Sequence, residues 1–257
     1  LPICGGGRRP LIRVCHLYPD LLNLYGDRGN IIAFQQRCKW RDIPVHVQSV
    51  NRGDKVCFRE LDFVFLGGGS DREQILIATD LMKRRDEFAA AIEGGLVVLA
   101  ICGGYQLLGA YYLNRDGENI PGLGILDFYT RAGERRLVGN VAVEVSLNGV
   151  PFKLVGFENH SGQTFLGDIQ PLGRVLSGNG NNGRDGLEGV WHKNVFGSYL
   201  HGPLLPKNVR LTDYLIGLCL ERRGLNKELM LLDDDFENRA CEAMLLRLVH
   251  RGNKLFC

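Results

Sequence analysis

The stretch LVVLAICGGYQ, residues 96–106, joins an unbroken apolar run to a cysteine and two glycines. The apolar run is typical of a strand that is buried on both faces of a parallel sheet. Gly103 and Gly104 permit a tight turn into a short helix, and this turn leaves Cys102 at a nucleophile elbow. The elbow lies at the carboxyl edge of the sheet, where open α/β sheets bind ligands, and the helix N-terminus favours the reactive thiolate. We therefore interpret Cys102 as a nucleophile rather than as a small core residue.

Strand and helix patterns alternate on both sides of this stretch. Upstream, we expect strands at 13–18, 45–50 and 63–66, a helix at 29–40 and a long helix from 71 to about 93. Downstream, apolar runs separated by glycine, at 137–145, 152–157 and 190–199, indicate an antiparallel continuation, and helices follow at 207–223 and 236–250. The pattern predicts an α/β fold with a mostly parallel central sheet flanked by helices and an antiparallel extension. We assign residues 11–257 to a single domain and residues 1–10 to a frayed lead-in.

The composition is that of an ordinary globular domain. Of the 257 residues, 45% are hydrophobic and 23% are charged, and the formal net charge is +2 with both signs interspersed. This balance excludes a disordered chain and offers no basic surface for nucleic acid or for an anionic membrane. Residues 94–114 carry no charge and are numerous enough to cross a bilayer, but Gly103, Gly104 and Gln106 interrupt them. We therefore expect no membrane span.

The eight cysteines form neither a C-x-x-C pair nor a cluster with histidines, so their spacing predicts no metal site. They are scattered through apolar segments of a chain that is long enough to build a good core, which favours reduced thiols over disulfides. The first residues also lack the apolar core of a signal peptide. These observations predict a cytoplasmic protein.

A cysteine nucleophile needs a base, and His201 is the best placed of the six histidines. It follows the apolar segment 195–200 and precedes Gly202 and Pro203, which is typical of a strand end that faces a cleft. His160, in the stretch ENHSG at 158–162, competes for this role. A purely structural role for His201 is the alternative interpretation.

Two glycine-rich stretches are candidates for anion binding by backbone N–H groups. The glycines at 67–69 follow a predicted strand and should share the sheet edge of Cys102, where their N–H groups and that of Gly103 could stabilise a developing oxyanion. A plain turn is the alternative there. The stretch GNGNNG, residues 178–183, lacks the Gly-Lys-Ser/Thr ending of a phosphate loop, so we favour a hairpin or a surface turn.

Six phrases resemble class I (triad-type) glutamine amidotransferases of the cobyric-acid-synthase-like branch and, within it, the amidotransferase subunits of lipid II isoglutaminyl synthases. The phrases are LYPDLLNLYGDRGN (17–30), FLGGGSDREQ (65–74), AICGGYQLLG (100–109), GFENHSGQTF (156–165), GNGNN (178–182) and NVFGSYLHGP (194–203). One such phrase is weak evidence, but six in the same order are specific, and they cover the chain from about residue 11 to 225. The resemblance implies a flavodoxin-like class I glutamine amidotransferase fold.

The activity that this resemblance implies is that of a glutaminase. Cys102 attacks the side-chain amide of L-glutamine, ammonia leaves, and water resolves a glutamyl thioester, while His201 shuttles the proton. The family pattern places the backbone amides of Gly68 and Gly103 in the oxyanion hole. It assigns substrate binding to Gly69, Gln106, Arg136, His160, Ser161 and Gly162. For Arg136 the alternative is a solvated charge at a strand end, because Arg135 stands next to it.

One position departs from the wider class. Triad amidotransferases carry a glutamate two residues after the catalytic histidine, and here that position is Pro203. No acidic residue within the local motif can orient the imidazole of His201. We therefore hypothesise that a carboxylate from a partner subunit completes the site.

The resemblance also implies a partner, because ammonia made in open water is protonated and diffuses away. The expected partner is a Mur-ligase-like synthase subunit that forms a heterodimer with this chain. It would activate the α-carboxylate of D-glutamate in the lipid II stem peptide, so that amidation gives D-isoglutamine. ATP and Mg²⁺ would belong to that subunit, and the present chain, which has no phosphate loop, should need no cofactor or metal. The alternatives are an amidotransferase that serves a cobyrinate-type acceptor and a non-catalytic binding subunit with the same fold.

Overall fold

Two six-stranded sheets form the framework of the computed structural model, which describes residues 11–252. The predicted lead-in at 1–10 lies outside the described residues. The first sheet has the strand order β11-β12-β4-β3-β1-β2. Its strands are β1 (Ile12–Leu17), β2 (Val45–Val50), β3 (Phe63–Leu66), β4 (Val97–Ile101), β11 (Val190–His192) and β12 (Val195–Ser198). All neighbours in it are parallel except the edge strand β11, which confirms the predicted parallel central sheet.

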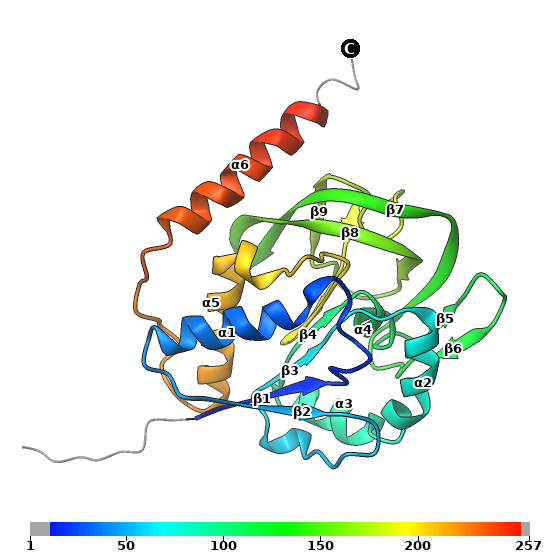
Figure 1. The fold of residues 1–257 in the computed structure, drawn as a ribbon, viewed down its shortest axis with the longest axis horizontal. Coiled ribbons are helices and arrows are strands. Elements are labelled where there is room, and N and C mark those ends of the chain that lie inside the picture. Colours follow the sequence, from blue (N-terminus) through cyan, green and yellow to red (C-terminus); the bar gives the residue numbers. More distant parts are fainter. Residues whose placement is uncertain (1–10, 253–257) are drawn as a thin grey trace, which may run out of the picture.

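The connections between the strands of this sheet predict at which edge a ligand binds. Helix α1 (Arg28–Lys39) links β1 to β2 in one direction along the sheet, whereas α2 (Asp71–Met82) and α3 (Arg85–Glu93) link β3 to β4 in the other. Because such crossovers are right-handed, helices on paths of opposite direction cover opposite faces. Helix α5 (Val209–Arg222) packs beside α1, and α2 and α3 lie on the other side (Figure 1). The direction switches between β1 and β3, and a crevice for ligands is expected at the carboxyl ends of these strands.

The single helix predicted from 71 to about 93 is in fact two helices. Ser70 and Glu73 form a capping box at the start of α2, and the chain leaves regular helix at Lys83 and Arg84 before α3 begins. Arg84 pairs with Asp80 one turn earlier. The break redirects the chain, so that α3 places a phenylalanine, Phe88, against Phe58 with 4.6 Å between ring centroids.

The second sheet is built on a long antiparallel hairpin, β7 (Phe128–Leu147) and β8 (Val150–Leu166). Its shorter strands are β5 (Tyr111–Leu113), β6 (Asn119–Pro121), β9 (Gly173–Ser177) and β10 (Leu187–Glu188). The register of the hairpin shifts between Ala132 and Leu137, so a short irregular segment stands opposite Ser161. The apolar run at 190–199, expected to continue the antiparallel part, instead forms β11 and β12, and β12 joins the first sheet in parallel to β4.

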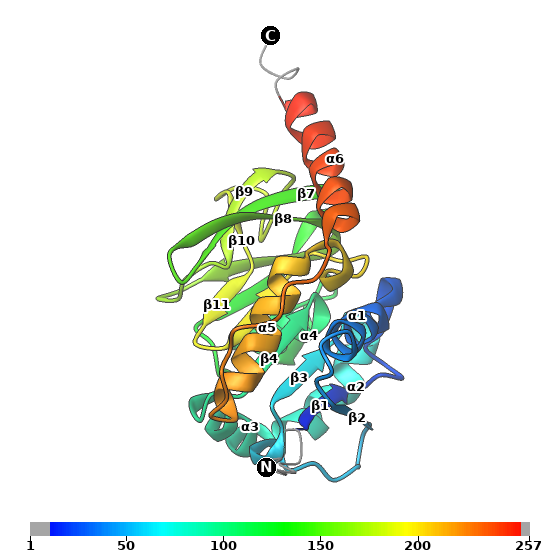
Figure 2. The ribbon, with the colours of Figure 1, turned by 90° about the vertical axis from the view of Figure 1, so that its left-hand side faces the viewer.

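Helices and ion pairs hold the layers together. One continuous hydrophobic core runs through both sheets and α5. The guanidinium of Arg37 in α1 is buried between the carboxylates of Asp213 in α5 and Asp234, with four hydrogen bonds of 2.6–2.8 Å. Asp234 directly precedes the last helix, α6 (Asp235–Gly252), whose end extends beyond the sheets (Figures 1 and 2). Within residues 11–252, no helix is both long and apolar enough to cross a bilayer.

Candidate active site

Cys102 sits at a strained turn between β4 and the short helix α4 (Gly103–Gln106). Its backbone has φ 49° and ψ −107°, a conformation that a residue with a side chain rarely adopts outside functional sites. The next two residues must be glycine because the turn after β3 lies against them: a Cβ on Gly103 would stand 2.8 Å from the backbone of Gly69, and one on Gly104 would stand 2.7 Å from Leu66 Cβ. The geometry is that of the predicted nucleophile elbow.

His201 lies beside this elbow and is fully buried. Its backbone forms an isolated β-bridge with Phe157 of β8, which anchors the histidine between the two sheets. A Cβ on Gly68 would stand 2.9 Å from His201 Cε1 and 3.4 Å from Cys102 Cβ, so the two predicted catalytic side chains converge on the glycine turn. Burial alone lowers the pKa of His201, but the Cys102 sulfur and the Asp27 carboxylate outweigh burial and raise it to about 10. A protonated imidazole beside a cysteine is the arrangement that stabilises a thiolate.

Asp27 is a site residue that the sequence motifs did not reveal. It stands between β1 and α1, is fully buried, and brings Oδ1 to 3.7 Å from His201 Nδ1. The local motif around His201 has no acid, but tertiary structure supplies one from 174 positions earlier in the chain. The partner-carboxylate hypothesis therefore faces an alternative within the chain. A sequence signal did exist, because Asp27 follows the first parallel strand and shares the sheet edge where the other candidates were sought.

The glycine turn after β3 supplies backbone donors at the same point. The N–H of Gly68, expected in the oxyanion hole, donates to Asp27 Oδ2 at 2.6 Å and is thereby occupied in this conformation. The N–H groups of Gly69 and Gly103 take part in none of the hydrogen bonds found among the described residues. These two groups are the free donors next to Cys102.

A pocket of about 320 Å³ opens onto Cys102. It is lined by Leu24, Gly69, Ser70, Asp71, Arg72, Gln74, Cys102, Gln106, Tyr112, Arg136, Asn159, His160, Ser161 and Gly162. The structure thus brings every predicted substrate-binding residue to the same cavity as the cysteine. His201, Gly68 and Gly103 are behind this lining rather than part of it.

A buried chain of polar side chains crosses the back of the pocket. Gln74 Nε2 donates to Gln106 Oε1 at 2.9 Å, and Gln106 Nε2 donates to the hydroxyl of Tyr199 at 3.1 Å. The same hydroxyl is 2.7 Å from Thr164 Oγ1 in β8. This chain joins α2, α4 and the second sheet, and it fixes the amide of Gln106 at the pocket wall.

His160 takes a structural position rather than that of the base. Its imidazole stacks on the ring of Tyr199 with 3.7 Å between centroids, and its Nδ1 lies 2.6 Å from the carbonyl oxygen of Gly162. Burial lowers the pKa of His160 to about 4, which keeps the ring neutral at physiological pH. His201 therefore stays the candidate base beside Cys102, and His160 lines the pocket.

Arg136 lies in the irregular segment of β7 and reaches the pocket mouth. Its Nε donates to Asn159 Oδ1, and its Nη2 lies 3.4 Å from the hydroxyl of Tyr25. The neighbouring Arg135 is exposed and does not line the pocket. The register shift therefore presents Arg136, and not Arg135, to a ligand in the cavity.

The stretch at 178–183 forms a turn, but part of it is deeply buried rather than on the surface. Asn181 and Asn182 are almost inaccessible, and Asn181 Oδ1 accepts a hydrogen bond from the hydroxyl of Tyr105 at 3.2 Å. The carboxylate of Glu158 accepts from the N–H groups of Asn179 and Gly180 at 2.8 and 2.9 Å. An acidic side chain thus occupies the donors that a phosphate would need.

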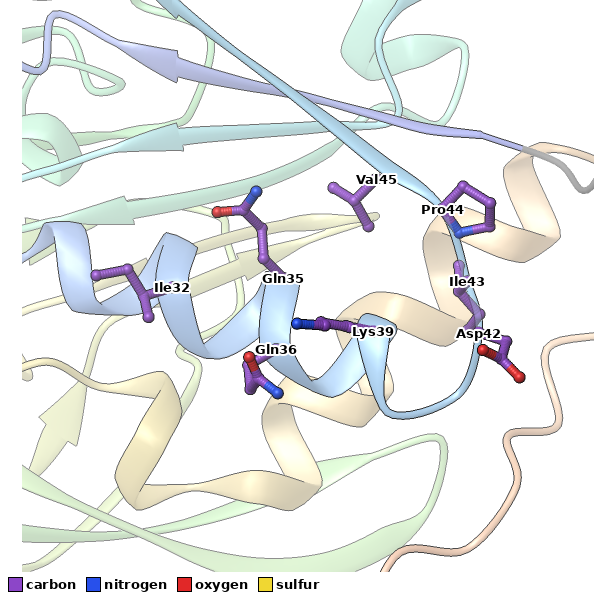
Figure 3. A pocket seen from close by; sticks show the side chains of 8 residues that line it. All are labelled: Ile32, Gln35, Gln36, Lys39, Asp42, Ile43, Pro44 and Val45. Carbon is purple, nitrogen blue, oxygen red and sulfur yellow. The ribbon is translucent and has the colours of Figure 1, made fainter.

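A larger hollow lies elsewhere on the surface, between α1, the turn after it and the first residue of β2 (Figure 3). It is lined by Ile32, Gln35, Gln36, Lys39, Asp42, Ile43, Pro44 and Val45, and by none of the predicted site residues. It stands at the amino end of β2, whereas open α/β sheets bind ligands at the carboxyl ends of their strands. The pocket at Cys102 is therefore the candidate active site.

In the part of the chain from 11 to 252, no group of three or more His, Cys, Asp or Glu side chains is placed to hold a metal ion. The cysteines in this part are free thiols: Cys15, Cys38, Cys57, Cys102, Cys219 and Cys241. Burial raises the pKa of Cys15 and Cys38 to about 12, so these thiols stay protonated. Cys102 differs from them in lining a cavity and in lying next to the imidazole of His201, whose pKa is raised.

Comparison with known proteins agrees with this geometry. Residues 13–209 match the model of the CobB/CobQ-like glutamine amidotransferase domain. The chain is 46% identical over 236 residues, 92% of its length and 96% of the relative, to a Staphylococcus aureus (strain N315) protein named lipid II isoglutaminyl synthase (glutamine-hydrolyzing) subunit GatD. It is 42% identical over 82% of both chains to the protein of the same name from Streptococcus pneumoniae (strain ATCC BAA-255 / R6).

A more distant sequence relative and a solved structure are also similar to this chain. A probable cobyric acid synthase of Methanothermobacter thermautotrophicus is 32% identical over 75% of this chain and 39% of its own length. A crystal structure described as a glutamine amidotransferase superposes with a TM-score of 0.50 at 18% identity, covering 80% of this chain and 98% of that one. At that identity the structural match establishes the fold alone.

Proposed function

Because the chain belongs to the CobB/CobQ-like glutamine amidotransferase family, we propose that it is the glutamine-hydrolysing subunit of a lipid II isoglutaminyl synthase. The observation that carries the proposal is the convergence of Cys102, His201 and the glycine turn on one cavity whose lining includes Arg136. The identity of 46% over nearly the whole length of a relative with that name supports the choice of synthase.

Hydrolysis proceeds through a thioester. The Cys102 thiolate forms a bond to the side-chain amide carbon of L-glutamine, and the amide oxygen takes up the negative charge. When the tetrahedral intermediate collapses, the C–N bond breaks and the imidazolium of His201 gives its proton to the departing nitrogen, which leaves as ammonia. Water then attacks the thioester while neutral His201 accepts its proton. The C–S bond breaks, L-glutamate leaves, and the thiolate and imidazolium are restored.

Oxyanion stabilisation and substrate orientation are assigned to separate groups. We assign the oxyanion to the N–H groups of Gly69 and Gly103, because Asp27 holds the N–H of Gly68. Arg136 at the pocket mouth suits the α-carboxylate of glutamine, and Asp71 in the same lining suits its α-ammonium group. The amide of Gln106, held in the buried polar chain, forms the wall beside them, together with Gly69 and the His160–Gly162 turn.

The acceptor half of the reaction belongs to a partner. Ammonia is useful only if a docked enzyme has activated a carboxylate, and we assign this step to a Mur-ligase-like synthase subunit in a heterodimer. That subunit would bind ATP and Mg²⁺ and activate the D-glutamate α-carboxylate of the lipid II stem peptide. We propose that the reaction takes place in the cytoplasm, where a reactive thiol such as that of Cys102 stays reduced and where ATP is available.

The proposal is tested with the purified chain, alone and with the co-expressed Mur-ligase-like subunit. Ammonia and glutamate release from L-glutamine is measured for the wild type and for Cys102→Ala, and lipid II with ATP and Mg²⁺ is then followed by mass spectrometry for conversion of its carboxylate to a carboxamide. We expect release that depends on Cys102, at a rate at least about 1,000-fold above that of the variant. We also expect amidated lipid II only when the partner is present.

The outcomes separate the alternatives. Glutamine hydrolysis that depends on Cys102 but leaves lipid II unchanged, with amidation of a cobyrinate-type acceptor instead, would replace the acceptor and keep the enzyme class. The similarity to a probable cobyric acid synthase makes that acceptor the matched control. Absence of hydrolysis in the complex would leave a non-catalytic binding subunit.

A further inference from the structure

We propose that Ser198 is a positioning residue of the active site, which holds the backbone of Cys102 and the segment leading to His201 in one arrangement. The hydroxyl of Ser198 is in turn fixed by the carboxyl group of Glu188. The proposal rests on the glutaminase function above and adds two residues to its machinery. Neither of them lines the pocket, so they act on hydrolysis through the residues that they hold.

The first support is the hydrogen bond between the backbones of Ser198 and Cys102. The N–H of Cys102 donates to the carbonyl oxygen of Ser198 at 2.8 Å, where the parallel strands β12 and β4 end side by side. Cys102 has φ 49° and ψ −107°, and a backbone in such a strained conformation persists only where neighbouring groups fix it. The position of the Ser198 peptide group therefore helps to set the position of the nucleophile.

The second support is the bend that the hydroxyl of Ser198 stabilises after the strand. Ser198 Oγ accepts the N–H of Leu200 at 3.0 Å, a local bond that turns the chain away from the direction of β12. His201 follows directly, and its backbone exchanges hydrogen bonds of 2.7 and 3.2 Å with Phe157 of the second sheet. The residue that contacts the backbone of Cys102 therefore also shapes the path to His201.

The third support is that Glu188 fixes this bend. Glu188 Oε1 accepts the hydroxyl of Ser198 at 2.8 Å and the N–H of Tyr199 at 2.7 Å. Both bonds end on the same oxygen, and the side chains of Glu188 and Ser198 are fully buried. Because the hydroxyl donates to Glu188, its lone pairs stay oriented toward the N–H of Leu200. The carboxyl group thereby selects one orientation of the hydroxyl.

The fourth support gives a role to the glycine- and asparagine-rich stretch at 178–183. The side-chain amide of Asn181 exchanges hydrogen bonds of 2.9 and 3.0 Å with the backbone of Gly189, the residue that follows Glu188. The hydroxyl of Tyr105 in α4 donates to the same amide at 3.2 Å. One buried polar network therefore connects Glu188 to the helix of the nucleophile elbow, and such a network favours a single arrangement of the groups that it joins.

The test compares Ser198→Ala with the wild type in the complex with the partner subunit. Loss of the hydroxyl frees the bend at Leu200, and a small displacement of the reacting groups is enough to slow the chemical step. We expect kcat for glutamine hydrolysis to fall about 10–100-fold, with KM within about 2-fold of wild type. The second readout needs no turnover and is the rate at which iodoacetamide alkylates Cys102, followed by peptide mass spectrometry. We expect this rate to fall several-fold, because a displaced His201 stabilises the thiolate less.

Two variants of Glu188 test the hydrogen bond itself. Glu188→Gln keeps an acceptor oxygen for Ser198 and Tyr199, and its kcat should stay within about 2-fold of wild type. Glu188→Met keeps a similar size without an acceptor oxygen, and its kcat should fall as far as that of Ser198→Ala. The double variant with both changes should lose little more than either single variant, because each removes the same interaction. Glu188→Met also serves if Ser198→Ala does not fold.

Thr212→Val is the matched control for loss of a buried hydroxyl. Thr212 is fully buried in α5, and its Oγ1 donates to the carbonyl oxygens of Leu205 and Asn208 at 2.9 and 3.3 Å, outside the pocket lining. We expect this variant to lower the melting temperature, as Ser198→Ala does, but to keep kcat and the alkylation rate within about 2-fold of wild type. A purely structural role of Ser198 would give the same pattern for both variants.

The inference and the proposed function fail separately. A wild-type kcat and alkylation rate in Ser198→Ala would overturn the positioning role, while hydrolysis that depends on Cys102 still stands. A Glu188→Gln variant as slow as Glu188→Met would also overturn it, because the acceptor oxygen would then be irrelevant. Absence of hydrolysis in the wild-type complex would remove the proposed function, whereas the alkylation rates would still report whether Ser198 holds Cys102 next to His201.

Discussion

The two walls of the pocket are built in different ways. One wall comes from the carboxyl ends of β3 and β4, where Cys102 and Gly69 line the pocket. Asp27 is buried next to this wall, on the N–H of Gly68, without lining the pocket. The candidate catalytic side chains, Cys102 and His201, are almost wholly buried and converge on Gly68. The opposite wall comes from the hairpin β7 and β8 of the second sheet, where Arg136 stands exposed at an irregular register.

We expect the two walls to have different functions. The strand ends of a parallel sheet converge on one edge and hold reacting groups in fixed positions, which suits the chemical step. The hairpin offers side chains that reach a ligand from the open side, which suits recognition of its α-groups. We therefore expect substitutions on the first wall to lower kcat and substitutions on the second wall to raise KM.

Arg136→Ala should have the largest effect on the hairpin wall. Loss of a charge-assisted contact to the α-carboxylate should raise KM for L-glutamine about 10–100-fold, while kcat changes by less than about 3-fold. The matched control is Arg135→Ala, because this neighbour is exposed and does not line the pocket. Steady-state kinetics of ammonia release measure both. A fall in kcat with unchanged KM for Arg136→Ala would contradict the division between the walls.

Tyr199→Phe tests the hydrogen bonds that connect the two walls through the hydroxyl of Tyr199. The hydroxyl of Tyr199 contacts Gln106 at 3.1 Å and Thr164 at 2.7 Å, and its loss leaves buried polar atoms without that partner. We expect a loss of stability of about 1–3 kcal/mol and an increase in KM of a few-fold. Urea unfolding and kinetics measure the two effects. The control is Tyr214→Phe, because Tyr214 is half-buried and does not line the pocket. Equal effects of the two substitutions on KM would contradict a role of the Tyr199 hydroxyl in holding the pocket wall.

Glu188→Gln should have the smallest effect. We expect it to change how the melting temperature depends on pH. Burial raises the pKa of Glu188 to about 7, although the hydroxyl of Ser198 opposes the shift. A carboxyl whose folded pKa lies above its unfolded value of 4.5 stabilises the fold least when ionised, so its contribution declines as the pH rises from about 4.5 to 7.

The Gln side chain cannot ionise and should remove this decline. Between pH 5.5 and 7.5, the melting temperature of Glu188→Gln should rise relative to that of wild type by roughly 4–7 °C. Thermal unfolding by circular dichroism at the two pH values measures the difference. A constant difference between the two proteins across this range would show that Glu188 does not titrate there. Kinetic parameters should stay close to those of wild type, because Glu188 is buried and does not line the pocket and because the Gln side chain keeps an acceptor oxygen for Ser198.

Local patterns predicted the strand-to-helix turns better than they predicted a helix break and the pairing of a short strand. The strand at 63–66, the elbow at Cys102 and the helix after it follow from residues that are neighbours in sequence, and the structure has them at those positions. The sequence does not predict the break at Lys83 and Arg84, because no glycine or proline marks it. After the break, α3 packs Phe88 against Phe58. The parallel placement of β12 was missed as well, since a short apolar run does not reveal which strand it joins.

The sequence by itself determined the parallel α/β framework, the cysteine at its strand-to-helix turn and the histidine at a late strand end. These features depend on residue order over a few positions, where steric freedom of glycine and apolar patterning decide the backbone. Only the tertiary structure decided that Asp27 lies next to His201 and that Arg136 rather than Arg135 lines the pocket. It also decided that the N–H of Gly68 donates a hydrogen bond to the carboxylate of Asp27. Those facts depend on how far-separated segments pack and on one shift of register in a hairpin, and no local pattern encodes either.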